Sequence, residues 1–219
     1  MKKLQFILLA LASATISSHA ATSFLLIQGN FGASGAFTSL EWQVNYNTGG
    51  LLTDQDLLNS VLGTPTDSHT QTSGGKEIYN SGNSTTGAQY YLDPTYGLFL
   101  ISFTLLGTTL APNYNIDSSY WTLSVAGGAG AYGSDGFGAA YPSGSWSYSN
   151  DGSASRTLAN GSYDAWYITG GSNPTNVTGV NPTTTDFANA TVVSAPEPTS
   201  LALLGGAFAA GLIRRKRIA

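Results

Sequence analysis

Residues 53–63, TDQDLLNSVLG, predict the only helix of a domain that otherwise has the pattern of β-strands. Hydrophobic side chains recur in this stretch at helical spacing: Leu57, Leu58, Val61 and Leu62. Thr53 is suited to cap the first turn, which also contains two aspartates, and Gly63 is suited to end the helix. This stretch therefore makes the expected fold class α+β, mainly β.

The segments on both sides of this helix have strand patterns. Residues 41–46 alternate between polar and hydrophobic, with Trp42, Val44 and Tyr46 on one face, as in a half-buried strand. Downstream, short hydrophobic runs separated by turn residues predict strands at 90–92, 97–106, 120–125, 145–148 and 162–168. We expect 97–106, rich in Phe, Leu and Ile, to be a central buried strand, and a single domain to cover residues 21–170.

The charge of the chain is unevenly distributed. Six of the eight Lys and Arg residues lie near the two ends, so Lys76 and Arg156 are the only cations between residues 21 and 195. This middle part is distinctly acidic, and the sequence therefore excludes nucleic acid and disfavours anionic lipid as partners. The chain also lacks cysteine, so about 150 residues must be stabilised by an ordinary hydrophobic core.

The first twenty residues have the composition of a signal peptide. Lys2 and Lys3 precede a hydrophobic run over residues 4–16, and residues 18–20 form a small-x-small site. We expect cleavage after Ala20.

The last fifty residues differ in composition from the domain. Residues 171–195 are rich in Thr, Asn and Pro, and we expect them to be an extended linker. Pro196, Glu197 and Pro198 follow, and then a hydrophobic run that includes Leu201, Leu203, Leu204, Phe208, Leu212 and Ile213. As a helix, residues 201–213 would be about 20 Å long, short of the hydrocarbon core of about 30 Å. Four cations come next and would hold this end in the cytoplasm: Arg214, Arg215, Lys216 and Arg217.

This order of parts over residues 196–219 resembles the PEP-CTERM sorting signal of bacterial exported proteins. The resemblance implies that an exosortase, a membrane transpeptidase-like enzyme, recognises residues 196–198 and removes the membrane helix. It also implies that the protein uses the export machinery, is anchored transiently in the inner membrane, and resides in the cell envelope or extracellular matrix. The alternative is an ordinary tail anchor in which the triplet occurs by chance.

The domain itself resembles the transcobalamin carboxyl-terminal-like module, of the DUF4430 type. The matching segments are residues 56–58, 96–101, 120–121 and 158–162 before Trp166. The resemblance implies a β-grasp-like fold, a small sheet wrapped on one helix, and an extracellular module that in some relatives binds corrinoids or other molecules. Two positions depart from the family pattern: Ala126-Gly127-Gly128 replaces an Asn-Gly pair, and Ser162 replaces an acidic residue.

Residues for catalysis are scarce, and we expect no enzyme activity and no cofactor. Once the signal peptide is removed, His69 is the only histidine, and its Thr- and Ser-rich surroundings predict an exposed loop. Residues 128–133 match Gly-x-Gly-x-x-Gly, but no amphipathic helix follows to bind a pyrophosphate. A zinc site is not expected, because the required His and Cys ligands are missing.

Two binding hypotheses remain open. Asp135, Asp151 and Asp164 are weak candidates for a calcium site, although the spaced Asp loop of the usual calcium motif is absent. Aromatic residues are candidates for contact with a polysaccharide or a small molecule. The first candidates are Trp121, Tyr132, Trp146 and Tyr148, and the other tryptophans, Trp42 and Trp166, and the many tyrosines could extend a stacking platform for a sugar or a flat ligand. The alternative role of these aromatic residues is packing in the core, which their alternation favours.

Overall fold

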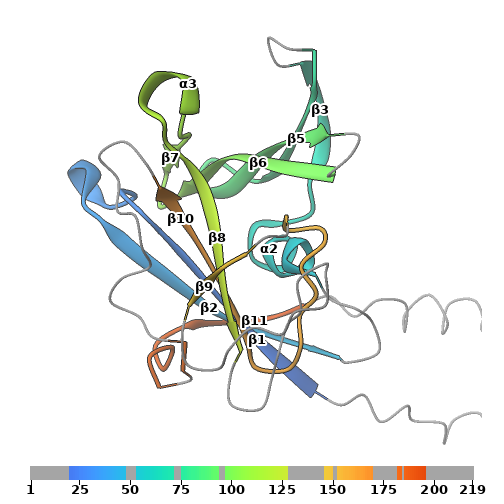
Figure 1. Ribbon diagram of the computed structural model, residues 1–219, viewed down its shortest axis with the longest axis vertical. Helices are drawn as coiled ribbons and strands as arrows, with labels where there is room; N and C mark the ends of the chain where they lie inside the picture. Colours follow the sequence, from blue (N-terminus) through green and yellow to red (C-terminus); the bar gives the residue numbers. More distant parts are fainter. Residues whose placement is uncertain are drawn as a thin grey trace, which may run out of the picture.

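The computed structural model describes residues 20–47, 53–71, 75–93, 97–127, 146–149, 152–169, 182–183 and 185–195, which form two β-sheets and a helix (Figure 1). The six-stranded sheet has the order β11-β2-β1-β10-β8-β9. Its strands are β1 (Ala20–Gly29), β2 (Thr38–Asn47), β8 (Tyr120–Gly127), β9 (Ser147–Tyr148), β10 (Ser162–Thr169) and β11 (Thr191–Ser194). It is mixed, because β1 pairs in parallel with β10 and β11 with β2.

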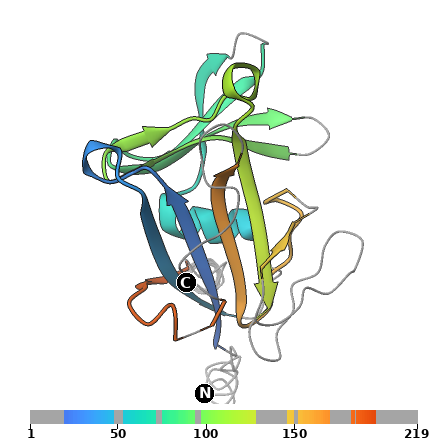
Figure 2. The ribbon, with the colours of Figure 1, turned by 60° about the vertical axis from the view of Figure 1, so that its left-hand side comes forward.

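The five-stranded sheet is antiparallel and follows the order of the chain. Its strands are β3 (Thr66–Gln71), β4 (Glu77–Gly82), β5 (Thr86–Asp93), β6 (Gly97–Leu105) and β7 (Thr108–Leu110). Figure 2 shows this sheet lying across one end of the six-stranded sheet, with α2 (Asp54–Leu62) between the two. Two shorter helical segments, η1 (Ala33–Gly35) and α3 (Tyr114–Asp117), lie in connections.

The predicted helix is confirmed with the caps that the sequence indicated. Thr53 accepts a hydrogen bond from the Asp56 backbone N–H, and the Thr53 N–H donates to the Asp56 carboxylate at 2.9 Å. This reciprocal pair satisfies two backbone groups at the start of the helix. Gly63 ends the helix with a φ of 88°, a conformation that favours glycine.

The main core lies between α2 and the facing sides of the two sheets. Leu57, Leu58 and Leu62 of α2 are buried with residues of both sheets, among them Leu25, Ile27, Tyr90 and Phe103. The other face of β1 contributes Phe24 and Leu26 to a second cluster. Strand β1 is therefore buried on both faces, as expected for a central strand with a parallel neighbour.

The fold class, β-rich α+β, is confirmed, whereas two finer expectations need correction. Strand β6 is not central: only the three-residue β7 separates it from the sheet edge, and Phe99 on it is 42% exposed. The sheet arrangement also differs from the expected single sheet around one helix. Strands β3–β7, which directly follow α2, form a sheet of their own, whereas β8–β11 join β1 and β2 in the other sheet.

The prediction of an extended linker over residues 171–195 is wrong for residues 185–195, which pack on the domain. Phe187 is buried against the rings of Phe24 and Tyr163, with centroid distances of 5.3 Å to each. Strand β11 then extends the six-stranded sheet, and the Ala195 N–H donates to the Asn45 carbonyl at 2.9 Å. One aromatic side chain and a four-residue strand are enough to attach this polar segment to the domain.

The predicted signal peptide, apart from Ala20 at the start of β1, lies outside the described residues. So do residues 196–219, which include the predicted membrane helix. Within the described part of the chain, none of the helices combines the length and the hydrophobicity needed to cross a membrane.

We predict that Phe187→Ala lowers the free energy of unfolding by about 3–5 kcal/mol, because it removes a buried ring. Urea unfolding measures this effect. The control is Val192→Ala in β11, where the side chain is 62% exposed and should matter little. Equal, small effects of both substitutions would contradict the attachment of residues 185–195 to the domain.

Candidate functional site

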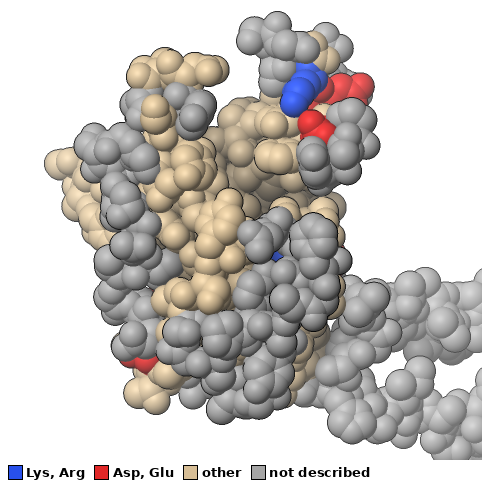
Figure 3. All heavy atoms as spheres, viewed as in Figure 1, with Lys and Arg blue, Asp and Glu red and all other residues tan. Residues whose placement is uncertain are grey.

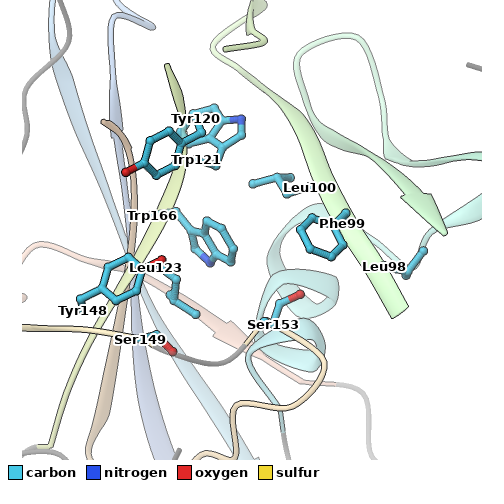
Figure 4. A pocket seen from close by; sticks show the side chains of 11 residues that line it. Leu98, Phe99, Leu100, Tyr120, Trp121, Leu123, Tyr148, Ser149, Ser153 and Trp166 are labelled. Atoms are coloured by element: carbon cyan, nitrogen blue, oxygen red, sulfur yellow. The ribbon is translucent and has the colours of Figure 1, made fainter. Parts of the chain in front are cut away.

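A pocket of about 450 Å³ lies where strands of the two sheets approach one another (Figure 4). Aromatic side chains from both sheets line it: Phe99 on β6, Tyr120 and Trp121 on β8, Tyr148 on β9 and Trp166 on β10. Figure 4 shows Trp121, Trp166 and Tyr148 on the side of the six-stranded sheet, opposite Leu98, Phe99 and Leu100 on β6. The pocket is thus a slot between an aromatic wall and a second, mainly hydrophobic wall.

The remaining lining residues of the pocket are small or aliphatic. Leu123 lies on the aromatic side, and Ser149, Gly152 and Ser153 come from the segments that connect β9 to β10. Among the described residues that line the pocket, none is an Asp, Glu, Lys, Arg or His. Figure 3 shows charged atoms gathered mainly at one corner of the molecule, and most of the described surface on this face is uncharged.

Both tryptophans of the pocket have their indole N–H bonded inside the protein. Trp121 Nε1 donates to the Ile101 carbonyl at 3.2 Å, and Trp166 Nε1 donates to the Asp54 carboxyl at 3.1 Å. Phe103 packs edge-on against both indoles, with centroid distances of 4.8 Å to Trp121 and 6.2 Å to Trp166. The rings are therefore fixed, and they offer the pocket hydrocarbon surface rather than hydrogen-bond donors.

A buried charged cluster formed by Asp54, Arg156 and Asp164 lies behind Trp166. Arg156 Nη2 contacts Asp164 Oδ1 at 2.9 Å, and neither side chain is exposed. Asp54, the first residue of α2, is also fully buried, and the charge of Asp164 acts on its carboxyl. Among the described residues, two carboxyls and one guanidinium thus share a fully buried site.

One proton balances the charge of this cluster. Burial raises the pKa of Asp54 well above its usual range, and the negative charge of Asp164 raises it further, against a smaller opposing effect of Arg156. Burial also raises the pKa of Asp164, but Arg156 favours its charged form. We infer that Asp54 keeps its proton while Asp164 is ionised and paired with Arg156, which makes the cluster neutral.

The cluster joins α2 to the loop that precedes β10. Backbone N–H groups at the start of a helix have no partner within it. Here the Asp54 N–H donates to the Arg156 carbonyl at 3.0 Å, and the Gln55 N–H donates to the Ser153 carbonyl at 2.9 Å. The Ser153 hydroxyl donates in turn to the Gln55 side chain at 2.9 Å. The same loop therefore caps the helix and places Ser153 in the pocket wall.

The structure brings together two of the four predicted ligand-contacting residues. Trp121 and Tyr148 both line the pocket, whereas Trp146 packs against the second hydrophobic cluster, and Tyr132 lies outside the described residues. Phe99, Tyr120 and Trp166 also line the pocket. Trp166 and the tyrosines belonged to the wider set of aromatic candidates, whereas Phe99 was not predicted as a ligand contact. All three belong to predicted strands, but the sequence gives no signal that these strands meet at one opening.

The other candidate residues do not form a chemical site in the described structure. Asp164, a calcium candidate, forms the buried ion pair with Arg156. The other two candidates, Asp135 and Asp151, lie outside the described residues. His69, expected in an exposed loop, lies in β3. Within the described ranges, no group of three or more His, Cys, Asp or Glu side chains is placed to hold a metal ion.

Comparison with known proteins gave no relative: no family model, no curated protein and no solved structure matches this chain.

We predict that the free energy of unfolding falls with rising pH over one interval. The interval begins at about pH 4, where aspartate titrates in an unfolded chain, and ends above the raised pKa of Asp54 in the native state. The native state binds one more proton in this interval, so the slope approaches about 1.4 kcal/mol per pH unit. Asp54→Asn, which mimics the protonated acid, should flatten the slope and stabilise the protein at alkaline pH.

Urea unfolding at a series of pH values measures this linkage. Asp67→Asn, at an exposed position of β3, is the matched control for the loss of one carboxyl group. If the Asp54→Asn variant kept the wild-type slope, the additional proton of the native state would not be bound in this cluster.

Proposed function

We propose that this chain is an exported bacterial surface or matrix protein, sorted through Pro196-Glu197-Pro198 and processed by an exosortase. The observation that carries the proposal is the order of features at residues 196–217: the triplet, a short hydrophobic run and four cations. A run of about 20 Å as a helix is short for a permanent anchor in a hydrocarbon core of about 30 Å, which supports removal after sorting.

The rest of the sequence is compatible with export. A basic and then hydrophobic start ends in a small-x-small site at residues 18–20, which agrees with a signal peptide. The chain has no cysteine to be oxidised outside the cytoplasm. The partners on this proposal are the export machinery, the processing enzyme and, before processing, the membrane.

We predict that the mature protein recovered from the envelope or the medium lacks residues 201–217, as measured by mass spectrometry. Changing Pro196, Glu197 and Pro198 together to Ala should leave the tail intact and retain the protein in the inner membrane. Pro174→Ala, a proline change outside the motif, is the control. An intact basic end on the mature, wild-type protein would overturn the processing step, as would cleavage of the triple variant.

A second candidate function is an extracellular ligand-binding module of the transcobalamin-like class, with a divergent β-grasp-like domain. The observation that favours it is the pocket in which Trp121 and Tyr148 meet. Its volume of about 450 Å³ lies in the lower part of the range for small-molecule sites, about 300–1,000 Å³. A pocket of this size suits a small ligand better than a complete corrinoid. The two proposals are compatible, since a sorted surface protein can also bind a ligand.

A further inference from the structure

We infer that the pocket between β6 and β8 binds a neutral, flat and mainly hydrophobic small molecule, such as a fused aromatic ring system. The inference rests on the second candidate function and specifies its ligand class. It follows from three properties of the described pocket: its shape, its lack of charge and the fixed positions of its rings.

The shape of the pocket suits a planar ligand. Trp121 and Trp166 present ring surface from the six-stranded sheet, and Leu98 and Leu100 lie across from them on β6 (Figure 4). A flat molecule inserted between these walls would bury both of its faces against hydrocarbon. Contact between aromatic rings is more favourable than the burial of area alone, which favours an aromatic ligand over an aliphatic one.

The described lining of the pocket disfavours an ionic ligand, because none of its side chains is charged. Asp54, Arg156 and Asp164, the charged groups that lie behind Trp166 in the described structure, are fully buried. A charged ligand would lose its hydration in the slot and gain no counter-charge from the described lining, which weakens its binding. A neutral ligand avoids this cost.

The polar groups of the pocket also disfavour a sugar. A bound sugar needs partners for several hydroxyls, because each buried hydroxyl left without a hydrogen bond weakens binding. The Trp121 and Trp166 N–H groups and the Ser153 hydroxyl already bond within the protein. Leu98, Leu100 and Leu123 have no polar side-chain atoms, which leaves the hydroxyls of Tyr120, Tyr148 and Ser149 as the other polar side-chain groups of the described lining. The lining therefore matches a hydrocarbon surface better than a polyol.

The pocket is ready to bind without rearrangement of its tryptophans. Each indole is held by one hydrogen bond and by the edge of Phe103. Binding therefore pays little conformational entropy for ordering these rings. Tyr148, which is 61% exposed at the edge of the six-stranded sheet, is the aromatic residue that a substitution can remove with least harm to the core.

The experiment is a fluorescence titration with N-phenyl-1-naphthylamine, a neutral aromatic probe, on the folded protein. We expect saturable enhancement of probe fluorescence and quenching of tryptophan emission. The anionic relative 8-anilino-1-naphthalenesulfonate should bind at least tenfold more weakly, and cellobiose should not compete. Equal binding of the two probes, or competition by cellobiose, would overturn the inferred ligand class.

Matched variants locate the site. Tyr148→Ala should weaken binding of the neutral probe about three- to tenfold, the value of one aromatic contact. Gly152→Trp places a large side chain in the lining at a position where a Cβ meets no atom within 4 Å, and it should also weaken binding. Phe37→Ala removes a 44% exposed ring that does not line the pocket, and it should have no effect. Circular dichroism confirms folding of each variant.

The failures of the inference and of the second candidate function are distinguishable. If the neutral probe does not bind, or binds equally to all variants, the inference is wrong. Calorimetry with a corrinoid, a glycan and calcium then decides the broader question. Heat from one of them would preserve a ligand-binding function with another ligand class, whereas no heat from any would remove both.

Discussion

The buried pair of Arg156 and Asp164 constrains the whole domain, because removing two charges from water is costly and their mutual attraction offsets that cost only while both side chains stay in place. Asp164 belongs to β10, the partner of both β1 and β8, and Arg156 belongs to the loop that caps α2. Asp54, whose pKa is raised by burial, adds the start of α2 to the same cluster. One neutral arrangement of three side chains thus fixes the helix against the six-stranded sheet.

The pocket depends on the same arrangement. Trp166 donates to Asp54 on one side and lines the slot on the other, while Ser153 connects the capping loop to the pocket wall. The second wall comes from β6 of the other sheet, so the pocket exists only where α2 holds the two sheets together. A loss of the cluster should therefore disturb the pocket as well as the stability of the fold.

The sequence predicted local elements well and their assembly poorly. Local patterns predicted the caps of α2, the strand β2 around Trp42 and the strand β10 that ends at Thr169, and the structure has all three. Strand β1 was not predicted, because its hydrophobic run follows closely on the hydrophobic run of the expected signal peptide. The cluster could not be predicted either: Asp54 and Asp164 are 110 residues apart in the chain, and only the scarcity of cations pointed to Arg156.

The most direct test of this account is a double-mutant cycle on the buried ion pair, measured by urea unfolding with Arg156→Met, Asp164→Leu and the double variant. Arg156→Met alone leaves a carboxylate without its partner and should cost about 3–5 kcal/mol. The double variant removes both charges, and we predict that it is more stable than additivity allows by about 1–3 kcal/mol. Additive costs of the two substitutions would contradict the central role of the cluster.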